Sequence, residues 1–343
     1  MQLRGTYSNN WMSGIVDVAP VNAISIPGAH DACSRIEGVK GSLSAQCQWF
    51  GITQLLNRGI RFLDVRCRYI TDGESGRTEN IYFPVHHGPV YQEILFEEIQ
   101  AQCIAFLTLN PSECILMNVQ MEDECLNNKN SCSDNFRTKF LELTRPYLDY
   151  WYMKSINPYL HDVRRRIVLI RSYNPQAEKG WSSGINRAQP STGNIWPDGW
   201  DGGGLEWSGF DFDGLSRNAT FETQNCYGKN WSMSSKEANV TQYLASAKGN
   251  ADVGKFTLNF VSCTSPSKSP GQLAGVLNPY VQQYLKSNTL RSLGVVAIDF
   301  VGNTGNGTGD SLENLIIEKQ LPDYIVPDTA YMGIPDWLQK VSA

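Results

Sequence analysis

The sequence lacks long apolar runs and an excess of basic residues. No run approaches the roughly 18 apolar residues that a membrane-spanning helix needs, although 41% of the 343 residues are hydrophobic. The 29 lysine and arginine residues are outnumbered by 34 aspartate and glutamate residues, which gives a net charge of −5. A chain without a basic field has no electrostatic means of attracting nucleic acid. We therefore expect no transmembrane segment and no nucleic-acid partner.

The sequence also lacks the Cys-x-x-Cys spacing of a zinc site and, at its start, the apolar core of a signal peptide. We expect either an intracellular chain or a sequence that begins after a cleavage site. Nine cysteines and four Asn-x-Ser/Thr sequons favour a secreted glycoprotein. Cys125 and Cys132 close a polar loop and are the expected local disulfide. The sequons begin at Asn218, Asn230, Asn239 and Asn306.

Histidine is scarce, and the first one follows an expected strand. The β-branched run 24–26 stops at Pro27-Gly28, a strong turn signal, and His30 and Asp31 follow at once. An imidazole changes charge near physiological pH, which suits it to proton transfer. A strand that ends in an imidazole and a carboxylate presents both groups at a rim where a substrate could reach them.

A second strand is expected at residues 60–66. With a period of two, Leu63 and Val65 face one side, and Asp64 and Arg66 face the other. The pattern fits a barrel strand with chemistry near its carboxyl end, and it also fits an edge strand with one solvated face. Asp64 is either an ion-pair partner of Arg66 or a site residue.

Strands and helices alternate along most of the chain. Strand 81–88 ends in His86 and His87, and a helix with an apolar face from Leu95 to Phe106 follows it. Six or seven strand–helix units predict a parallel sheet with right-handed crossovers, closed into an α/β barrel. The other expected strands are 114–122, 166–171, 255–261 and 294–299, and the other expected helices are 46–58, 135–144 and 311–319.

The expected organisation is a single catalytic domain with short flanking segments. Residues 1–20 form a lead-in in which Trp11 and Met12 are packing residues. Residues 21–325 form the barrel, with long loops at 174–254, and residues 326–343 form a tail. The loop assignment rests on the sequence after Asn174, which is rich in glycine, tryptophan and aspartate.

Five strand ends carry chemically useful side chains. Two histidines, a buried carboxylate and an arginine suit the cleavage of a phosphodiester by an internal hydroxyl group. One imidazole removes the hydroxyl proton and the other protonates the leaving oxygen. A carboxylate orients the base, and a guanidinium stabilises charge on the phosphoryl oxygens. The side chains are those of His30 with Asp31, Arg66, His87, Arg171 and Asp299.

Four ordered motifs resemble the X-type catalytic domain of phosphatidylinositol-specific phospholipases C. They are Ser-Ile-Pro-Gly-x-His-Asp at 25–31, Gly-x-Arg-x-x-Asp-x-Arg at 59–66, His-His-Gly-Pro at 86–89 and Asn-Pro-Ser-Glu at 110–113. The resemblance runs from about residue 21 to residue 300 and is strongest in the first 125 residues. It implies an irregular TIM-type barrel.

The resemblance also implies roles for individual residues. His30 would be the general base that takes the proton of the inositol 2-hydroxyl, oriented by Asp299. His87 would be the general acid for the diacylglycerol leaving oxygen, supported by Asp31. Arg66 would stabilise the pentacoordinate phosphorane. The products would be diacylglycerol and inositol 1,2-cyclic phosphate.

Arg66 also bears on cofactors and partners. Large calcium-dependent members of the family have an acidic metal ligand at this position, whereas the single-domain bacterial type has arginine. The chain is therefore similar to the metal-independent branch, and we expect no metal and no cofactor. The partner would be a phospholipid at a membrane interface, contacted transiently by a monomer.

The substrate pocket follows the family less closely. Tyr227 and Asn225 are expected to line the inositol pocket, and Arg171 to contact a hydroxyl or phosphate. Bacterial relatives have a lysine where this chain has Gln120, and an arginine where it has Ser172. These departures leave the headgroup open between phosphatidylinositol, glycosyl-phosphatidylinositol and another phosphodiester.

Two other functions are compatible with the sequence. One is a metal-dependent phosphodiesterase of the glycerophosphodiester or sphingomyelinase D kind, against which Arg66 argues. The other is a catalytically silent barrel that binds a lipid or glycan. His30, His87, Arg66 and Asp299 argue against this, whereas the changed pocket residues favour it.

Overall fold

The computed structural model describes most of the chain. The described residues are 8–38, 45–69, 83–122, 136, 139–153, 157–172, 185–186, 220–225, 232–263, 265, 267–302 and 311–326. The Cys125–Cys132 pair, Tyr227, the sequons other than Asn239 and the tail 327–343 lie outside them. No described helix is both long enough and apolar enough to cross a membrane.

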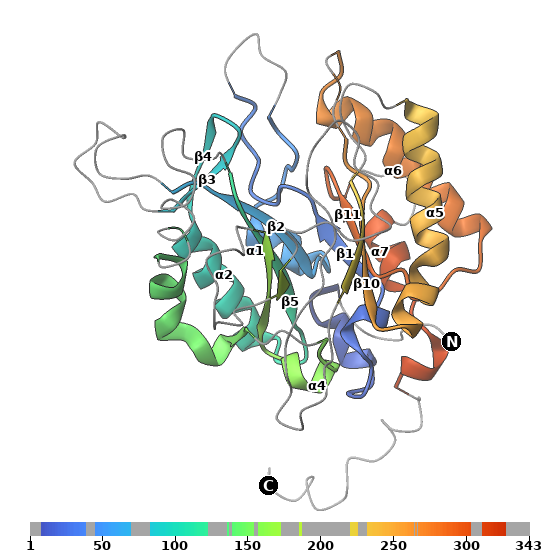
Figure 1. The fold of residues 1–343 in the computed structure, drawn as a ribbon, viewed down its shortest axis with the longest axis horizontal. Coiled ribbons are helices and arrows are strands. Elements are labelled where there is room, and N and C mark those ends of the chain that lie inside the picture. Colours follow the sequence, from blue (N-terminus) through green and yellow to red (C-terminus); the bar gives the residue numbers. More distant parts are fainter. Residues whose placement is uncertain are drawn as a thin grey trace, which may run out of the picture.

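The described strands form one curled sheet with helices on its outside (Figure 1). The order β6-β7-β5-β2-β1-β11-β10-β9 is parallel throughout, and β8 pairs with β7. Within the described residues no strand pairing joins β9 to β6 or β8. The strands are β1 (Ile26–Ala29), β2 (Phe62–Cys67), β3 (Pro84–His87), β4 (Val90–Leu95), β5 (Ile115–Met121), β6 (Trp151–Tyr152), β7 (Ile167–Ser172), β8 (Ile185–Asn186), β9 (Thr220–Gln224), β10 (Lys255–Phe260) and β11 (Val295–Ile298).

Helices alternate with these strands, which confirms the predicted α/β, TIM-type fold class. Residues 139–144 are also helical. The other α-helices are α1 (Ile52–Asn57), α2 (Phe96–Leu109), α4 (Leu160–Val163), α5 (Met233–Asp252), α6 (Pro270–Ser287) and α7 (Leu312–Ile317). The 3-10 helices are η1 (Ser8–Gly14), η2 (Val21–Ala23), η3 (Arg145–Tyr150) and η4 (Pro322–Tyr324).

The predicted turn at Pro27-Gly28 is wrong, because β1 continues through both residues. The carbonyl of Pro27 accepts the backbone N–H of Arg61 at 2.9 Å. A Cβ at position 28 would lie 2.7 Å from the ring of Phe62 on the neighbouring strand. Glycine is therefore required here by close packing against β2, and the chain first turns after the strand, where Asp31 has φ +44°.

The strand that ends in His87 is antiparallel, not one of the predicted parallel barrel strands. It forms the hairpin β3–β4, with His87 opposite Val90. Only Gly88 and Pro89 connect the two strands, and a parallel crossover needs a dozen or more residues. A tight turn therefore forces an antiparallel partner, and helix α2 begins only after β4.

Three further predictions need correction. The helix expected at 46–58 is the shorter α1, which begins after Gly51, although it ends at Arg58-Gly59 as predicted. The region 174–254, expected to be long loops, contains β9 and the 20-residue α5. Helix α6 was missed altogether, since Pro270 begins it and Pro279 lies within it, and both residues resemble helix breakers in a sequence.

The lead-in closes the amino-terminal end of the sheet. Trp11 and Met12 are buried, as predicted, and the indole N–H of Trp11 donates to the carbonyl of Gly59 at 2.9 Å. Both residues pack with Phe62 and with the inward-facing apolar side chains of the central strands. The opposite end of the strands is left for polar side chains.

A buried ion pair joins two of the motifs found in the sequence. The guanidinium of Arg61 lies 2.8 Å from the carboxylate of Glu113, and neither side chain is exposed. The same carboxylate accepts the backbone N–H of Met12 at 3.0 Å, and the guanidinium donates to the carbonyl of Asn9 at 2.8 Å. The pair thus connects the lead-in with the starts of β2 and β5.

We predict that Glu113→Gln lowers the free energy of unfolding by ~3–5 kcal/mol, because the buried charge of Arg61 loses its partner. Urea unfolding followed by circular dichroism measures the change. The control is Asp252→Asn, which removes an exposed ion pair with Lys248 and should cost less than ~0.5 kcal/mol. Equal effects of the two substitutions would contradict a structural role for the buried pair.

Candidate active site

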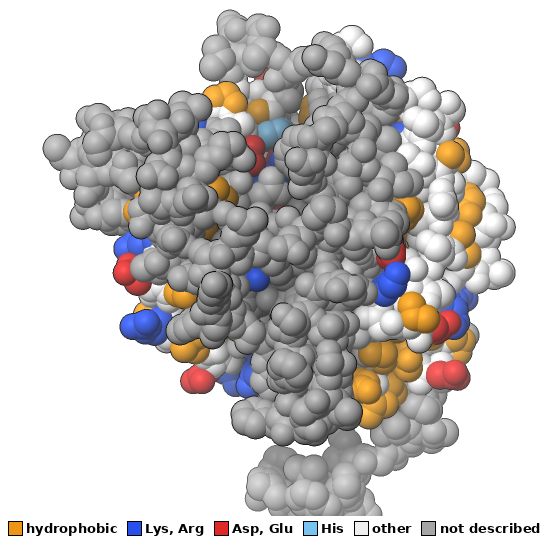
Figure 2. Space-filling view, in the orientation of Figure 1, with side chains coloured by type: hydrophobic (Ala, Val, Ile, Leu, Met, Phe, Trp, Pro, Cys, Tyr) orange, Lys and Arg blue, Asp and Glu red, His pale blue; other side chains and the backbone are white. Residues whose placement is uncertain are grey.

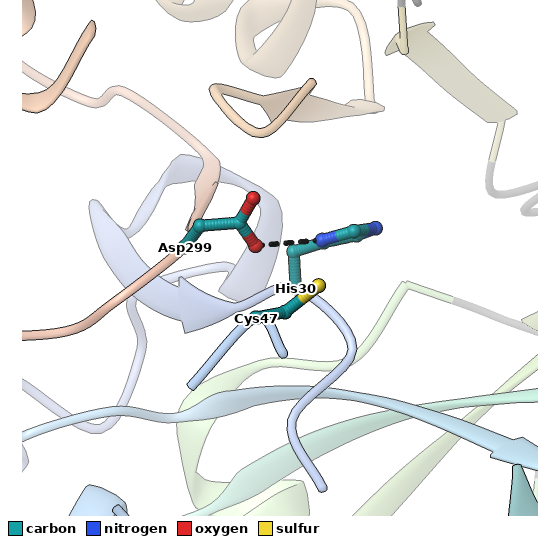
Figure 3. A group of neighbouring side chains, drawn as sticks. All are labelled: His30, Cys47 and Asp299. Atoms are coloured by element: carbon teal, nitrogen blue, oxygen red, sulfur yellow. Dashed lines mark hydrogen bonds and ion pairs between the residues drawn. The ribbon is translucent and has the colours of Figure 1, made fainter. Parts of the chain in front are cut away.

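His30 and Asp299 meet at the carboxyl ends of two neighbouring strands. Ala29 of β1 is in register with Ile298 of β11, so the residues that follow each strand lie side by side. The Nδ1 atom of His30 is 2.8 Å from an oxygen of Asp299 (Figure 3). The carboxylate can only accept, so Nδ1 carries the hydrogen and Nε2 presents its lone pair.

The environment of His30 favours its protonated form. Burial alone would lower the pKa of His30, but the charge of Asp299 and its hydrogen bond outweigh burial, and the pKa is raised. Nε2 of His30 is 2.8 Å from the guanidinium of Arg66, whose positive charge acts in the opposite sense. The imidazole is therefore poised between a carboxylate on one nitrogen and a cation on the other.

Arg66 is held by two buried carboxylates. Its guanidinium lies 3.1 Å from Asp64 and 3.4 Å from Asp31. Asp64 accepts a further hydrogen bond from the amide of Asn118 at 2.6 Å, and Ser172 donates to the other end of that amide at 2.5 Å. Asp64 is thus an ion-pair partner of Arg66, and Ser172 belongs to the chain of hydrogen bonds that fixes it.

His87 faces the same group of charges from the β3–β4 hairpin. Its Nδ1 donates to the carbonyl of Ala45 at 2.7 Å and lies 3.4 Å from Asp31. The side chain of His87 is 28% exposed, twice the value for His30. The side chain of His86, the preceding residue in the strand, points to the opposite face and is buried. Figure 2 shows histidine and acidic side chains gathered at one place in a hollow of the viewed surface.

The extended segment 45–48 contacts both histidines. The carbonyl of Ala45 accepts the hydrogen bond from His87. The side-chain amide of Gln48 donates to the carbonyls of His30 at 2.8 Å and Ile298 at 2.9 Å. The side-chain oxygen of Gln48, Oε1, accepts the backbone N–H of Val301 at 3.2 Å. This buried amide braces the ends of β1 and β11 against each other. Sequence reasoning missed it, because the segment resembled the first turns of a helix.

A fourth carboxyl group lies beside the hairpin turn. Glu122 accepts the backbone N–H of Gly88 at 2.7 Å. Burial raises the pKa of Glu122, and the charges of Arg66 and His87 act against that shift. Glu122 closes the strand predicted at 114–122, but sequence reasoning assigned it no role in the site.

The expected pocket residues are only partly brought together. Gln120 is in register with Arg66 on one side and Ser172 on the other, so all three point to the site face of the sheet. Arg171 is in register with Val119, whose side chain lies in the apolar layer outside the sheet. Asn225 is buried just after β9, at the same end of the sheet.

Part of the chain matches a known family model, and most of it aligns with two known proteins. Residues 32–173 match the family model described as the phosphatidylinositol-specific phospholipase C, X domain. The 1-phosphatidylinositol phosphodiesterase of Listeria monocytogenes is 27% identical over 308 residues, which cover 85% of this chain and 81% of that protein. The enzyme of the same name from Staphylococcus aureus strain Newman is 25% identical over 322 residues, covering 90% and 93%.

Solved structures agree with the sequence comparison on the fold. A Staphylococcus aureus phosphatidylinositol-specific phospholipase C with incorporated pentafluoro-Phe superposes with a TM-score of 0.72 at 24% identity, covering 94% of this chain and all of that one. The Listeria monocytogenes enzyme gives a TM-score of 0.66 at 23% identity, covering 92% and 100%. Residues 32–173 thus match the phosphatidylinositol-specific phospholipase C X-domain family model, and the resemblance inferred from the motifs is confirmed.

Proposed function

We propose that this chain cleaves phosphatidylinositol-type lipids by attack of the inositol 2-hydroxyl on the phosphodiester. The products are diacylglycerol and inositol 1,2-cyclic phosphate. The observation that carries the proposal is the pair of imidazoles, each beside its own buried carboxylate, with Arg66 in contact with His30 and Asp31. We further propose that residues 21–325 act as one catalytic domain, which the single sheet from β1 to β11 supports.

His30 acts as the general base. Its Nε2 lone pair takes the proton of the 2-hydroxyl as the oxygen attacks phosphorus. The imidazolium that forms is stabilised by Asp299, which holds the Nδ1–H at 2.8 Å. Because Arg66 now donates to Nε2, the guanidinium must turn towards the phosphate oxygens when substrate binds. The negative charge of the phosphodiester favours this movement.

His87 acts as the general acid. Its Nδ1–H is already held by the carbonyl of Ala45, and Asp31 lies close enough to stabilise the protonated ring. Nε2 is then the atom that delivers a proton to the diacylglycerol oxygen as the P–O bond breaks. The greater exposure of His87 fits a group that meets a departing lipid.

Arg66 supplies the positive charge for the phosphorane. The fork of the guanidinium can donate two hydrogen bonds to phosphoryl oxygens. Its contacts with Asp31 and Asp64 already balance part of the acidic charge in the site. We therefore favour the metal-independent mechanism over a metal-dependent phosphodiesterase.

The substrate is a membrane lipid, so we propose that the enzyme binds a bilayer peripherally, transiently and as a monomer. Membrane binding, and its modulation, is a property of the Staphylococcus aureus phosphatidylinositol-specific phospholipase C, which shares this fold. Secretion, glycosylation and the Cys125–Cys132 disulfide stay predictions. Among the cysteines that the structure describes, those at positions 33, 47, 67, 103 and 114 hold free thiols.

We predict that His30→Ala and His87→Ala each reduce turnover of phosphatidylinositol vesicles by ~10²–10⁴-fold, because each removes one proton-transfer group. The reaction is followed by phosphorus NMR in excess EDTA, where the wild-type product is the cyclic phosphate. The matched control is His161→Ala, which removes a half-exposed histidine of α4 that has no role in the proposed mechanism. Wild-type turnover by either site variant would refute two-histidine catalysis.

Asp299→Asn should shift the pH dependence of kcat/KM. The base works when neutral, so activity rises as pH increases through the pKa of His30. Asp299 raises that pKa, so its removal should move the acidic limb to lower pH and lower the maximum by ~10²–10⁴-fold. An unmoved limb, or one that moves to higher pH, would show that Asp299 does not act through His30.

Arg66→Lys keeps the charge but loses the planar fork. We expect kcat to fall by ~10²–10³-fold, comparable to the loss of one preorganised donor to a developing anion. Steady-state kinetics with and without added calcium measure the effect. Wild-type turnover that requires calcium or magnesium would support the metal-dependent alternative. An absence of wild-type turnover under any condition would favour the catalytically silent barrel that binds a lipid or glycan.

A further inference from the structure

The thiol of Cys47 lies between the two histidines. Its Sγ atom is 3.9 Å from Nδ1 of His87, and it also lies within 4.8 Å of a ligand atom of His30 and of Asp299 (Figure 3). One ligand atom from each of Asp31, Cys47 and His87 lies within 4.8 Å of the other two. The proposed mechanism assigns no role to this thiol.

A buried carboxylate oxygen points into the same space. Asp31 is 1% exposed, and among the described residues its Oδ2 atom accepts no hydrogen bond. Oδ2 has only longer ionic contacts, at 3.4 Å to His87 and 3.4 Å to Arg66. Among the described residues, the hydrogen-bond contacts of the Cys47 thiol are long and weak as well, at 3.8 Å to the Ala45 carbonyl and 3.9 Å to His87.

These three groups are the ligand types that zinc prefers. A thiolate, an imidazole and a carboxylate bind Zn²⁺ at about 2.0–2.3 Å, which in a tetrahedron puts ligand atoms about 3.3–3.8 Å apart. The observed separations of 3.4 Å and 3.9 Å need little change. The surrounding charge is also suitable, because the carboxyl groups of Asp31, Asp64 and Glu122 act together on the guanidinium of Arg66, and Asp299 lies beside His30.

We propose that Asp31, Cys47 and His87 form an inhibitory site for Zn²⁺ or a similar borderline-soft divalent cation. Three protein ligands leave the fourth position to water. Binding releases the thiol proton to solvent. In neutral His87 the proton on Nδ1 moves to Nε2, and the Nδ1 lone pair binds the metal in place of the hydrogen bond to Ala45.

Such binding removes the general acid. An imidazole with a metal on Nδ1 cannot become an imidazolium, so Nε2 no longer carries a readily transferable proton. Asp31 is withdrawn from the histidine at the same time. The inhibitory effect rests on the proposed function of His87, whereas the binding of the ion does not.

The binding test uses the full chain freed of metal. Isothermal titration with Zn²⁺ should give one site per chain, and Co²⁺ should give a thiolate charge-transfer band in the near ultraviolet. Both signals should be lost in Cys47→Ala and weakened in Asp31→Asn. They should persist in Asp299→Asn and in the matched control Cys103→Ala, which removes a buried thiol from α2. Circular dichroism establishes that each variant is folded.

Some binding results would overturn the site. One is undiminished zinc binding by Cys47→Ala. Another is binding that is lost in Asp299→Asn but kept in Asp31→Asn, which would place the ion beside His30 instead. A Co²⁺ complex without the thiolate band would also exclude Cys47 as a ligand.

The functional test compares phosphatidylinositol cleavage with and without Zn²⁺ within each variant, so that differences in basal activity cancel. Saturating zinc should reduce wild-type turnover at least ~10-fold, EDTA should restore it, and Cys47→Ala should be insensitive. Binding without loss of turnover would overturn the inhibitory role. A wild type inactive in EDTA would instead refute the proposed function, and the titrations alone would then decide the zinc site.

Discussion

The buried ion pair between Arg61 and Glu113 is the constraint on which the rest of the structure depends. It is fully enclosed, and its remaining hydrogen-bonding capacity is met by the lead-in and by backbone carbonyls. The two residues stand at the starts of β2 and β5, whose far ends carry Arg66 and Gln120. Parallel strands β2 and β5 run in register. Fixing their starts with the ion pair therefore also fixes the relative positions of the polar side chains at their carboxyl ends.

The site itself follows from charge balance in a closed space. Several carboxyl groups are buried around one arginine and two histidines, and none could remain ionised there without partners. Asp64 is satisfied by Arg66 and Asn118, and Asp299 by His30. The carboxylates therefore determine where the cationic groups stand before any substrate arrives. A phosphodiester then enters a site whose donors are already oriented.

The sequence predicts much of this arrangement, because strand ends of a parallel sheet converge. His30, Arg66, His87 and Asp299 were found as polar residues closing apolar runs, and the barrel class came from the alternation of strands and helices. The sequence could not predict Gln48, since a buried amide that braces two backbones has no periodic pattern. Pro27-Gly28 and Pro270 misled the prediction for a related reason: a closely packed strand uses glycine, and the start of a helix uses proline, where a local pattern indicates a break.

The segment 45–48 limits how the sequence of the enzyme can evolve. One end of it holds the ring of His87 and the other holds the backbones of His30 and Ile298. Four consecutive residues thus help to hold the spacing between base and acid, in addition to the strands that carry the two histidines. A one-residue insertion or deletion here would misalign both proton transfers together, while loops of any length elsewhere on the rim could vary to suit new headgroups.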